Sequence, residues 1–276
     1  MPKVSILTPL YNTNPIHLRQ MIESILNQTY TDFEFLILND SPQNKKLEEI
    51  VNSYNDSRIK YYKNESNLGI SESRNKLLQL AKGEYIAIFD HDDISLPTRL
   101  EREVNYLNEN PLVGVVSCNI RTKIRNKKSH FPIKNSDIKI DLICRGCVIS
   151  HTSSMIRKEI LVQNNIKWEQ EFSPCEDYML WGKLIDKTMF HNINESLVIY
   201  RDHNENTTHL QRELMDDKSD IIKNYLYNKY PYFAEMKNSR FSVKLFNFIP
   251  FIQSKRNGNK IKYFLFGIFP ILKIEK

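Results

Sequence analysis

Glycine is scarce in this chain, which argues against the loops that wrap phosphate groups in backbone. The 276 residues include only seven glycines. Neither the P-loop pattern GxxxxGK[ST] nor the dinucleotide-binding pattern GxGxxG occurs. Both patterns depend on glycine because backbone N–H groups must approach the phosphates closely. If the chain binds a diphosphate, a divalent cation held by carboxylates is the remaining standard device.

Cysteines and long apolar runs are also few. Four cysteines (Cys118, Cys144, Cys147, Cys175) in a chain of this length are typical of reduced thiols in a cytosolic protein. Cys144 and Cys147 form a lone CxxC, which is weak support for zinc or redox chemistry. No apolar stretch reaches the roughly 18 to 20 residues of a spanning helix. Because Met1 leads straight into a strand-like run, we expect no signal peptide and a cytoplasmic protein.

Acidic residues nearly disappear from the end of the chain. Residues 237–276 contain nine Lys and Arg but one acid, Glu275, which gives a net charge of +8. Since the whole chain carries +6, the first 236 residues carry −2. A nearly neutral body therefore precedes a basic C-terminal segment in which aromatic residues alternate with cations.

The first half alternates short β-rich runs with amphipathic segments. Apolar residues between the runs recur at helical spacing, as in Leu18, Met21 and Ile22. Strand–helix alternation predicts an α/β fold, with parallel strands joined by right-handed crossovers and helices on both faces. The predicted strands are Val4–Pro9, Phe33–Asp40, Arg58–Tyr62, Tyr85–Phe89 and Val113–Ile120.

Polar residues cluster where three of these strands end. They are Thr8–Asn12, Asn39–Ser41 and Asp90–Asp93. In open α/β sheets, ligands bind beyond the carboxyl ends of the strands, so we expect the three loops to form one crevice. The alternative for each loop is that Asn, Asp, Pro and Ser simply make turns.

The stretch FDHDDISLP, Phe89–Pro97, places three aspartates within four residues. Like charges at this spacing repel unless a cation or a large ligand lies among them, so the stretch indicates a metal site. The alternative is helix capping, because Ser95 and Pro97 are typical of a helix start.

These motifs resemble the family 2 glycosyltransferases, which are inverting enzymes with the GT-A fold. The similar stretches are LTPLYN (7–12), SILNQTYTDFEFLILNDS (24–41), NLGISESRNKLLQLAKGEYIAIFDHDD (67–93) and CEDYMLW (175–181). The similarity runs from about residue 3 to about residue 209. HTSSMIRKEIL (151–161) and YRDHNENTT (200–208) look most like transferases that build bacterial lipopolysaccharide, O-antigen or capsule oligosaccharides.

The resemblance implies a GT-A nucleotide-sugar-binding fold, a mostly parallel central sheet flanked by helices, and roles for matching residues. The base and ribose are expected to contact Pro9, Tyr11 and Asn12, with Asp40 accepting a hydrogen bond from the base and Arg74 near the nucleotide. Asp90 and Asp92 match the DxD pair: Asp90 faces the ribose and the metal, and Asp92 ligates Mn²⁺ or Mg²⁺. Asp93 either assists or caps the next helix. Glu176-Asp177 matches the catalytic pair, with Asp177 as general base; the alternative is an acidic helix start.

Two histidines each have more than one possible role. His203 either completes the metal or diphosphate site, since imidazole and oxygen anions suit Mn²⁺, or is an exposed loop residue. His151 is a weaker candidate near the acceptor.

The expected domains are a catalytic domain over 1–215 and a basic, amphipathic helical extension over 216–276. The catalytic domain divides into a nucleotide-sugar half, about 1–117, and an acceptor half, about 118–215. Residues 237–276 favour docking on an anionic membrane surface at the inner face of the cell membrane. Nucleic-acid binding and packing on the catalytic domain are the alternatives.

The expected function is metal-assisted transfer of a hexose or N-acetylhexosamine, most simply from a UDP-sugar, to a hydroxyl of an oligosaccharide or lipid-linked saccharide. A sugar nucleotidyltransferase would place a glycine-rich start after the first strand, where this chain has Tyr11-Asn12. An inactive sugar- or lipid-binding module is the non-enzyme alternative.

Overall fold

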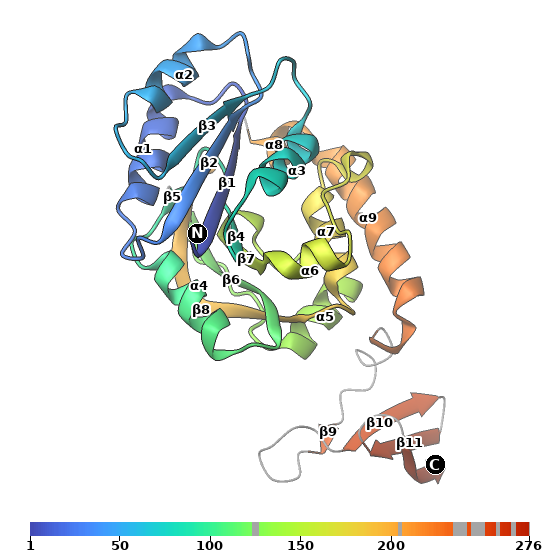
Figure 1. Cartoon of the computed structure of the whole chain (residues 1–276). Coiled ribbons are helices and arrows are strands. Elements are labelled where there is room, and N and C mark those ends of the chain that lie inside the picture. Colours follow the sequence, from blue (N-terminus) through green and yellow to red (C-terminus); the bar gives the residue numbers. More distant parts are fainter. Residues whose placement is uncertain are drawn as a thin grey trace.

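The computed structural model of the chain describes residues 1–122, 127–203, 206–233, 242–243, 252–257, 260–265 and 269–275. Its main body is an eight-stranded sheet with helices on both faces (Figure 1). The strand order is β3-β2-β1-β4-β7-β6-β8-β5. The strands are β1 (Val4–Leu10), β2 (Phe33–Asn39), β3 (Ile59–Lys63), β4 (Tyr85–Ile88), β5 (Ile94–Ser95), β6 (Val113–Thr122), β7 (Ser154–Arg157) and β8 (Met189–Tyr200).

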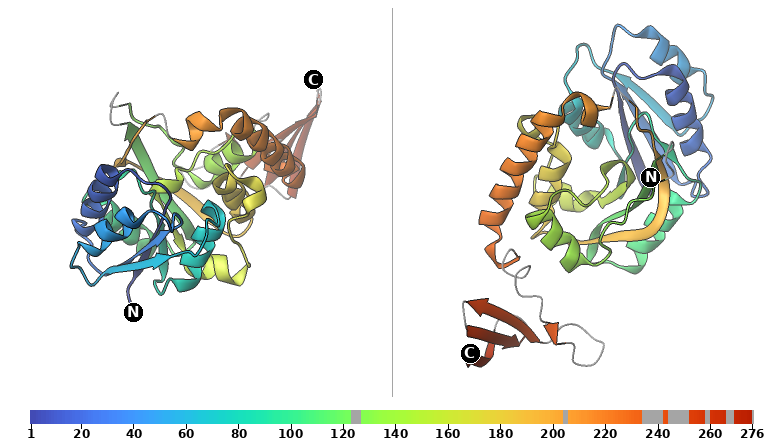
Figure 2. Two further views of the ribbon diagram at one scale, coloured as in Figure 1. Left: turned by 90° about the horizontal axis from the view of Figure 1, so that it is seen from above. Right: turned by 180° about the vertical axis from the view of Figure 1, so that it is seen from behind.

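The sheet is parallel where the sequence alternates strand and helix, as predicted. β1 pairs in parallel with β2 and β4, and β2 with β3. All residues of β1 and β2 are buried, which is the pattern of strands covered on both faces. Beyond β4 the sheet is mixed, because β7 runs antiparallel to β4 and β6, while β6 and β8 are parallel. Figure 2 shows β8 curling round the end of the sheet, where it pairs with β5.

Each face of the sheet carries its own apolar cluster and its own helices (Figures 1 and 2). Leu18, Leu47 and Leu100 anchor α1, α2 and α4 on one face. Leu77, Trp181 and Leu226 anchor α3, α7 and α9 on the other, which we call the α7 face. The helices are α1 (Pro15–Leu26), α2 (Lys45–Asn52), α3 (Ile70–Leu80), α4 (Arg99–Glu109), α5 (Asn135–Cys144), α6 (Lys158–Gln163), α7 (Glu176–Leu184), α8 (Thr207–Leu210) and α9 (Arg212–Lys229), with 3-10 turns η1 (His151–Ser153) and η2 (Gln170–Phe172).

The prediction of a helical extension over 216–276 is wrong beyond α9. Four antiparallel strands follow in the order β12-β11-β10-β9. One of these strands shows the reason, because KIKY (260–263) alternates lysines with a β-branched and an aromatic residue at the period of a strand. Residues 244–251, between β9 and β10, lie outside the described residues. The strands are β9 (Ser242–Val243), β10 (Ile252–Asn257), β11 (Lys260–Leu265) and β12 (Phe269–Glu275).

None of the helices in the described ranges is long and apolar enough to cross a bilayer.

Candidate active site

The three polar loops meet at the carboxyl edge of the sheet, as the sequence predicted. The Thr8 hydroxyl donates to the Phe89 carbonyl across 2.8 Å, which joins the first loop to the Asp-rich loop. The Asn12 N–H donates to Ser41 Oγ, also across 2.8 Å, which joins the first loop to the second. Asn12 has a φ of 46°, a left-handed conformation that Asn tolerates better than most residues. The loops therefore form one connected rim.

The expected nucleotide residues occupy this rim in different ways. Pro9 is a buried residue of β1, whereas the Tyr11 side chain just beyond the strand is 54% exposed. The Asp40 carboxylate is buried and accepts hydrogen bonds from Asn64 Nδ2 (2.7 Å) and from the N–H groups of Leu68 and Gly69 (both 2.9 Å). Asp40 therefore fixes the loop that leads into α3.

Arg74 of α3 connects the two acidic groups of the site. Its Nη1 donates to Glu176 Oε1 (2.7 Å), and its Nη2 donates to Asp90 Oδ1 (2.9 Å). The Arg74 side chain is only 6% exposed and that of Glu176 8%, so both charges depend on each other for solvation. Burial raises the pKa of Asp90, an effect that Arg74 opposes. The bridge brings the predicted catalytic pair next to the Asp-rich loop.

Asp92 and His203 lie together beside this bridge. Asp92 Oδ2 is 3.0 Å from His203 Nε2, and both side chains are partly buried. Among the residues that the structure describes, no group of three His, Cys, Asp or Glu could hold a metal ion, and Asp90 is paired with Arg74. A carboxylate and an imidazole at this distance fit a cation such as Mn²⁺ that also takes oxygen ligands from a diphosphate. Asp92 and His203 are therefore the two candidate ligands.

Asp93 and Arg201 form the buried layer under Asp92. The Asp93 carboxylate is fully buried, and its Oδ1 accepts the Arg201 N–H across 3.0 Å. Burial, together with Asp92 and Asp90, raises the pKa of Asp93 well above its usual range. Arg201 is 4% exposed, and its Nε and Nη2 have no hydrogen-bond partner within the described ranges. Sequence reasoning did not single out the contact between Asp93 and Arg201, although Arg201 stands in the quoted stretch YRDHNENTT.

Asp177, the expected general base, lies in the first turn of α7, and its Oδ1 accepts the N–H of Tyr178 across 2.7 Å. Burial, and after it the neighbouring Glu176, raises the pKa of Asp177 to about 7. A carboxylate with this pKa exchanges protons readily at neutral pH. Glu176 is paired with Arg74, so Asp177 is the candidate for a general base among these two carboxylates.

His151 lies under α7, where its described contacts are structural. Its Nε2 accepts the Trp168 Nε1–H across 3.0 Å, and its ring packs edge-on against Trp168 and Trp181. Burial lowers the pKa of His151 well below its usual range, so the ring is neutral. In η1, the neighbouring Thr152 accepts the Asp90 N–H at Oγ1 across 3.1 Å. Sequence reasoning did not select Thr152, which is a further contact to the Asp-rich loop.

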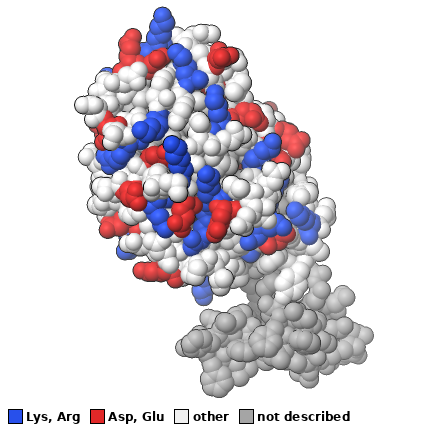
Figure 3. Space-filling view, viewed as in Figure 1, with Lys and Arg blue, Asp and Glu red and all other residues white. Residues whose placement is uncertain are grey.

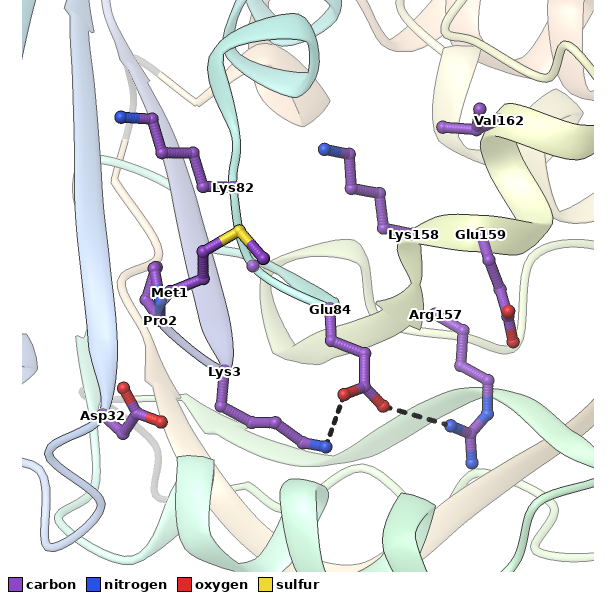
Figure 4. A pocket seen from close by; sticks show the side chains of 11 residues that line it. Met1, Pro2, Lys3, Asp32, Lys82, Glu84, Arg157, Lys158, Glu159 and Val162 are labelled. Carbon is purple, nitrogen blue, oxygen red and sulfur yellow. Dashed lines mark hydrogen bonds and ion pairs between the residues drawn. The ribbon is translucent and has the colours of Figure 1, made fainter.

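A separate cavity of about 680 Å³ lies at the amino ends of β1 and β4, beside Lys3 and Glu84 (Figure 4). Its walls mix charges: Lys3 and Arg157 both pair with Glu84. Figure 3 shows the same mixture of Lys and Arg with Asp and Glu across this face of the molecule. The cavity opens at the opposite end of β1 from Tyr11 and takes no part in the site.

Comparison with protein families gives one model match. The model described as "Glycosyl transferase family 2" matches residues 5–163. An uncharacterized glycosyltransferase of Methanocaldococcus jannaschii is 36% identical over 252 residues, which cover 87% of this chain and 81% of that protein. The O-antigen biosynthesis glycosyltransferase WbnJ of Escherichia coli is 32% identical over 195 residues, which cover 67% of this chain and 74% of WbnJ.

Solved structures resemble the fold. TarS 1-349 of S. aureus in complex with UDP-GlcNAc has a TM-score of 0.63 and 18% identity, over 88% of this chain and 76% of that one. The mannosyltransferase PcManGT of Pyrobaculum calidifontis in complex with GDP-Man and Mn²⁺ has a TM-score of 0.58 and 15% identity, over the same shares. At these identities the likeness concerns the fold.

Proposed function

The chain belongs to glycosyltransferase family 2, has the GT-A fold, and is a glycosyltransferase; on that premise, we propose that it inverts the anomeric centre of a UDP-linked hexose or N-acetylhexosamine during transfer. The proposed acceptor is a hydroxyl of a lipopolysaccharide, O-antigen or capsule oligosaccharide. WbnJ supports this acceptor class by its name, and the TarS complex with UDP-GlcNAc supports a UDP-sugar donor.

The observation that carries the proposal is that Asp177, with its pKa raised to about 7, lies next to the Asp90–Arg74–Glu176 bridge. An acceptor hydroxyl must lose its proton as it attacks the anomeric carbon. Asp177 accepts that proton, a contribution of roughly 10²–10⁴-fold in rate. Arg74 holds Asp90 and Glu176 in place, so that Asp177 keeps a fixed position relative to the Asp-rich loop.

The metal ligands that we propose are Asp92 and His203. A divalent cation at these residues neutralises the negative charge that develops on the leaving diphosphate, without a proton transfer. The complex of PcManGT with GDP-Man and Mn²⁺ supports a divalent cation in this fold. Arg201 lies under the same site and adds a fixed positive charge. The nucleotide contacts proposed for Tyr11 and Asn12 lie on the adjoining rim, while Pro9 and Asp40 support it from within.

We further propose that residues 237–276 attach the enzyme to an anionic membrane surface, where a lipid-linked acceptor is found. The net charge of +8 supports this, since each Lys or Arg near an anionic leaflet contributes about 1 kcal/mol. The described part of this segment forms short strands where an amphipathic helical extension was expected, so we propose that attachment depends on charge and not on an amphipathic helix.

The test is donor hydrolysis, with water in place of the acceptor. The full chain is incubated with UDP-glucose, UDP-galactose or UDP-N-acetylglucosamine and Mn²⁺, and the released sugar is followed by NMR before it mutarotates. We expect the β-anomer to be released first from an α-linked donor. An α-anomer released first would exclude single displacement, and no hydrolysis of any UDP-sugar would exclude the donor class.

A further inference from the structure

At the carboxyl edge of the sheet, residues 121–122 at the end of β6 pair with residues 127–128. We call these two described arms the hairpin; the proposed reaction does not use it. Arg121 forms an antiparallel bridge with Lys128. One step further along, the Thr122 N–H donates to the Lys127 carbonyl across 2.9 Å. Residues opposite each other in such a bridge share a face, with Cα atoms about 4.5–5.5 Å apart. Arg121 and Lys128 therefore lie on one face of the hairpin, and Thr122 and Lys127 on the other.

Asn119 holds the returning strand of this hairpin in place. Asn119 is buried, and its Oδ1 accepts the Ser129 hydroxyl (3.2 Å) and the Phe131 N–H (3.0 Å). Its Nδ2 donates to Asn194 Oδ1 of β8 across 3.2 Å. The base of the hairpin is therefore fixed to the sheet, and the two cations are presented at a defined position.

Two cations opposite each other are unfavourable without an anion. Like charges directly opposite on paired strands destabilise the pairing. The sequence supplies no compensation nearby, because no acidic residue occurs between Glu109 and Asp137. In the part of the chain that the structure describes, no acid forms an ion pair with Arg121 or Lys128. A bound anion would convert this repulsion into attraction.

The pair lies on the face of the sheet that carries Asp177. Val115 packs in the apolar cluster of the α7 face, and Val116 in the opposite cluster. Residues two apart in a strand share a face, so Ser117, Asn119 and Arg121 follow Val115 onto the α7 face. The register irregularities at Asn119 add residues to β8 and not to β6, and Ile120 packs against the opposite cluster, as this alternation requires. The Ser117 hydroxyl agrees with this assignment of faces, because it contacts the Ser153 hydroxyl of η1 across 3.0 Å, and His151 of η1 packs against Trp181 of α7.

The hairpin is also close to the Asp-rich loop. Arg121 is in register with Ile199 of β8, two residues before Arg201, whose N–H binds Asp93. With strands about 4.8 Å apart and about 3.3 Å per residue, the Arg121 backbone lies about 8 Å from that of Arg201. Arg121 therefore lies near the Asp-rich loop, on the face of the sheet that α7 covers.

We propose that Arg121 and Lys128 bind a phosphate or carboxylate group on the acceptor saccharide, so that the enzyme prefers an anionic acceptor. This inference rests on the proposed transfer to a saccharide hydroxyl. The acceptor is favoured over the donor because the diphosphate already has Asp92, His203 and Arg201 beside it. Arg supplies a planar fork of donors and Lys a point charge, and both bind phosphate and carboxylate oxygens well.

The experiment compares Arg121→Gln/Lys128→Gln with Lys127→Gln in the full chain. Lys127→Gln removes the same kind of charge from the opposite face of the hairpin and is the matched control. The probe is a fluorescently labelled mannan oligosaccharide phosphate, compared with the same oligosaccharide after phosphatase treatment. We expect the native chain and Lys127→Gln to bind the phosphorylated probe about tenfold more tightly, and the double variant to lose that preference. The KM for hydrolysis of the UDP-sugar should be the same in all three proteins.

Three results would overturn the inference. The first is a native chain that shows no preference for the phosphorylated probe. The second is a double variant with a raised KM for the UDP-sugar, which would mean that Arg121 and Lys128 bind the donor. The third is a double variant that loses only binding to phosphatidylglycerol vesicles, which would mean that the two residues bind a lipid surface. Failure of the proposed function is distinct, because a native chain that hydrolyses no UDP-sugar can still be tested for binding of the two oligosaccharides.

Discussion

The guanidinium of Arg74 donates a hydrogen bond to Glu176 across 2.7 Å and thereby joins α3 to the start of α7. The two residues are 102 positions apart in the sequence. Arg74 Nη2 also donates to Asp90 Oδ1 across 2.9 Å, so one buried cation binds two carboxylates from different segments. The bridge makes the site one rigid unit rather than two facing loops.

Replacing Arg74 is expected to cost both stability and activity. Arg74→Met keeps much of the volume but leaves Glu176 as an uncompensated buried charge. Breaking one side of a buried pair costs about 3–5 kcal/mol. Urea unfolding measures the loss, and donor hydrolysis should fall by orders of magnitude under conditions where the variant remains folded.

The control for this prediction is Arg145→Met. Arg145 pairs with Asp141 on the surface of α5, and its side chain is 54% exposed. Exposed pairs contribute no more than about 1 kcal/mol, so this variant should unfold close to the native protein. Equal losses in the two variants would mean that the Arg74 bridge has no special energetic role.

Asp92→Asn is expected to weaken metal binding and turnover together. The substitution keeps the shape but removes the charge that faces His203 at 3.0 Å. We expect the Mn²⁺ concentration for half-maximal hydrolysis to rise at least about tenfold and the rate to fall by orders of magnitude. Asp202→Asn is the control, because Asp202 pairs with the exposed His209 and not with the site. If enzyme treated with EDTA keeps full activity, Asp92 and His203 do not hold a required metal.

Much of this arrangement could be predicted from the sequence, and the reason is local. Val4–Leu10 and Phe33–Asn39 are strands because they are short, apolar and followed by turn residues, and the positions of Asp40 and Asp90 at strand ends follow directly. What could not be predicted depends on partners far along the chain. Arg201 meets Asp93 across 108 positions, a contact that no spacing rule indicates. The C-terminal strands could not be predicted either, because only a short part of that segment, residues 260–263, alternates cations with apolar residues.

The activity is expected to follow the protonation of Asp177. As a base it must be ionised, so the rate of donor hydrolysis should rise about tenfold per pH unit below its pKa of about 7 and level off above it. A rate that is flat between pH 5 and pH 8 would exclude Asp177 as the base. Asp177→Asn should bind the UDP-sugar and lose transfer.

The same pKa predicts the sign of a stability effect. The folded pKa of Asp177 lies above that of the unfolded chain, so the folded state binds the proton more tightly, and stability from this group is lost as pH rises through about 7. Asp177→Asn removes that penalty and keeps the acceptor for Tyr178. We expect it to raise the free energy of unfolding by about 1–2 kcal/mol at pH 8 and much less at pH 5. The exposed Asp220→Asn on α9 should show no such pH dependence.

The last prediction concerns three lysines of the C-terminal sheet. Lys262 of β11 is in register with Lys255 of β10 on one side and Lys273 of β12 on the other. These lysines belong to residues 237–276, whose net charge of +8 an anionic surface attracts. We therefore expect the full chain to bind phosphatidylglycerol vesicles at low salt and the triple variant Lys255→Gln/Lys262→Gln/Lys273→Gln to bind them much less.

Three Lys→Gln changes on the catalytic domain, at Lys46, Lys60 and Lys167, give a control of equal charge. In the described residues β9–β12 form a sheet separate from that of the catalytic domain, so hydrolysis of the UDP-sugar should be unchanged in both variants. Equal vesicle binding by the native chain and the triple variant would mean that these lysines do not attach the enzyme to the membrane.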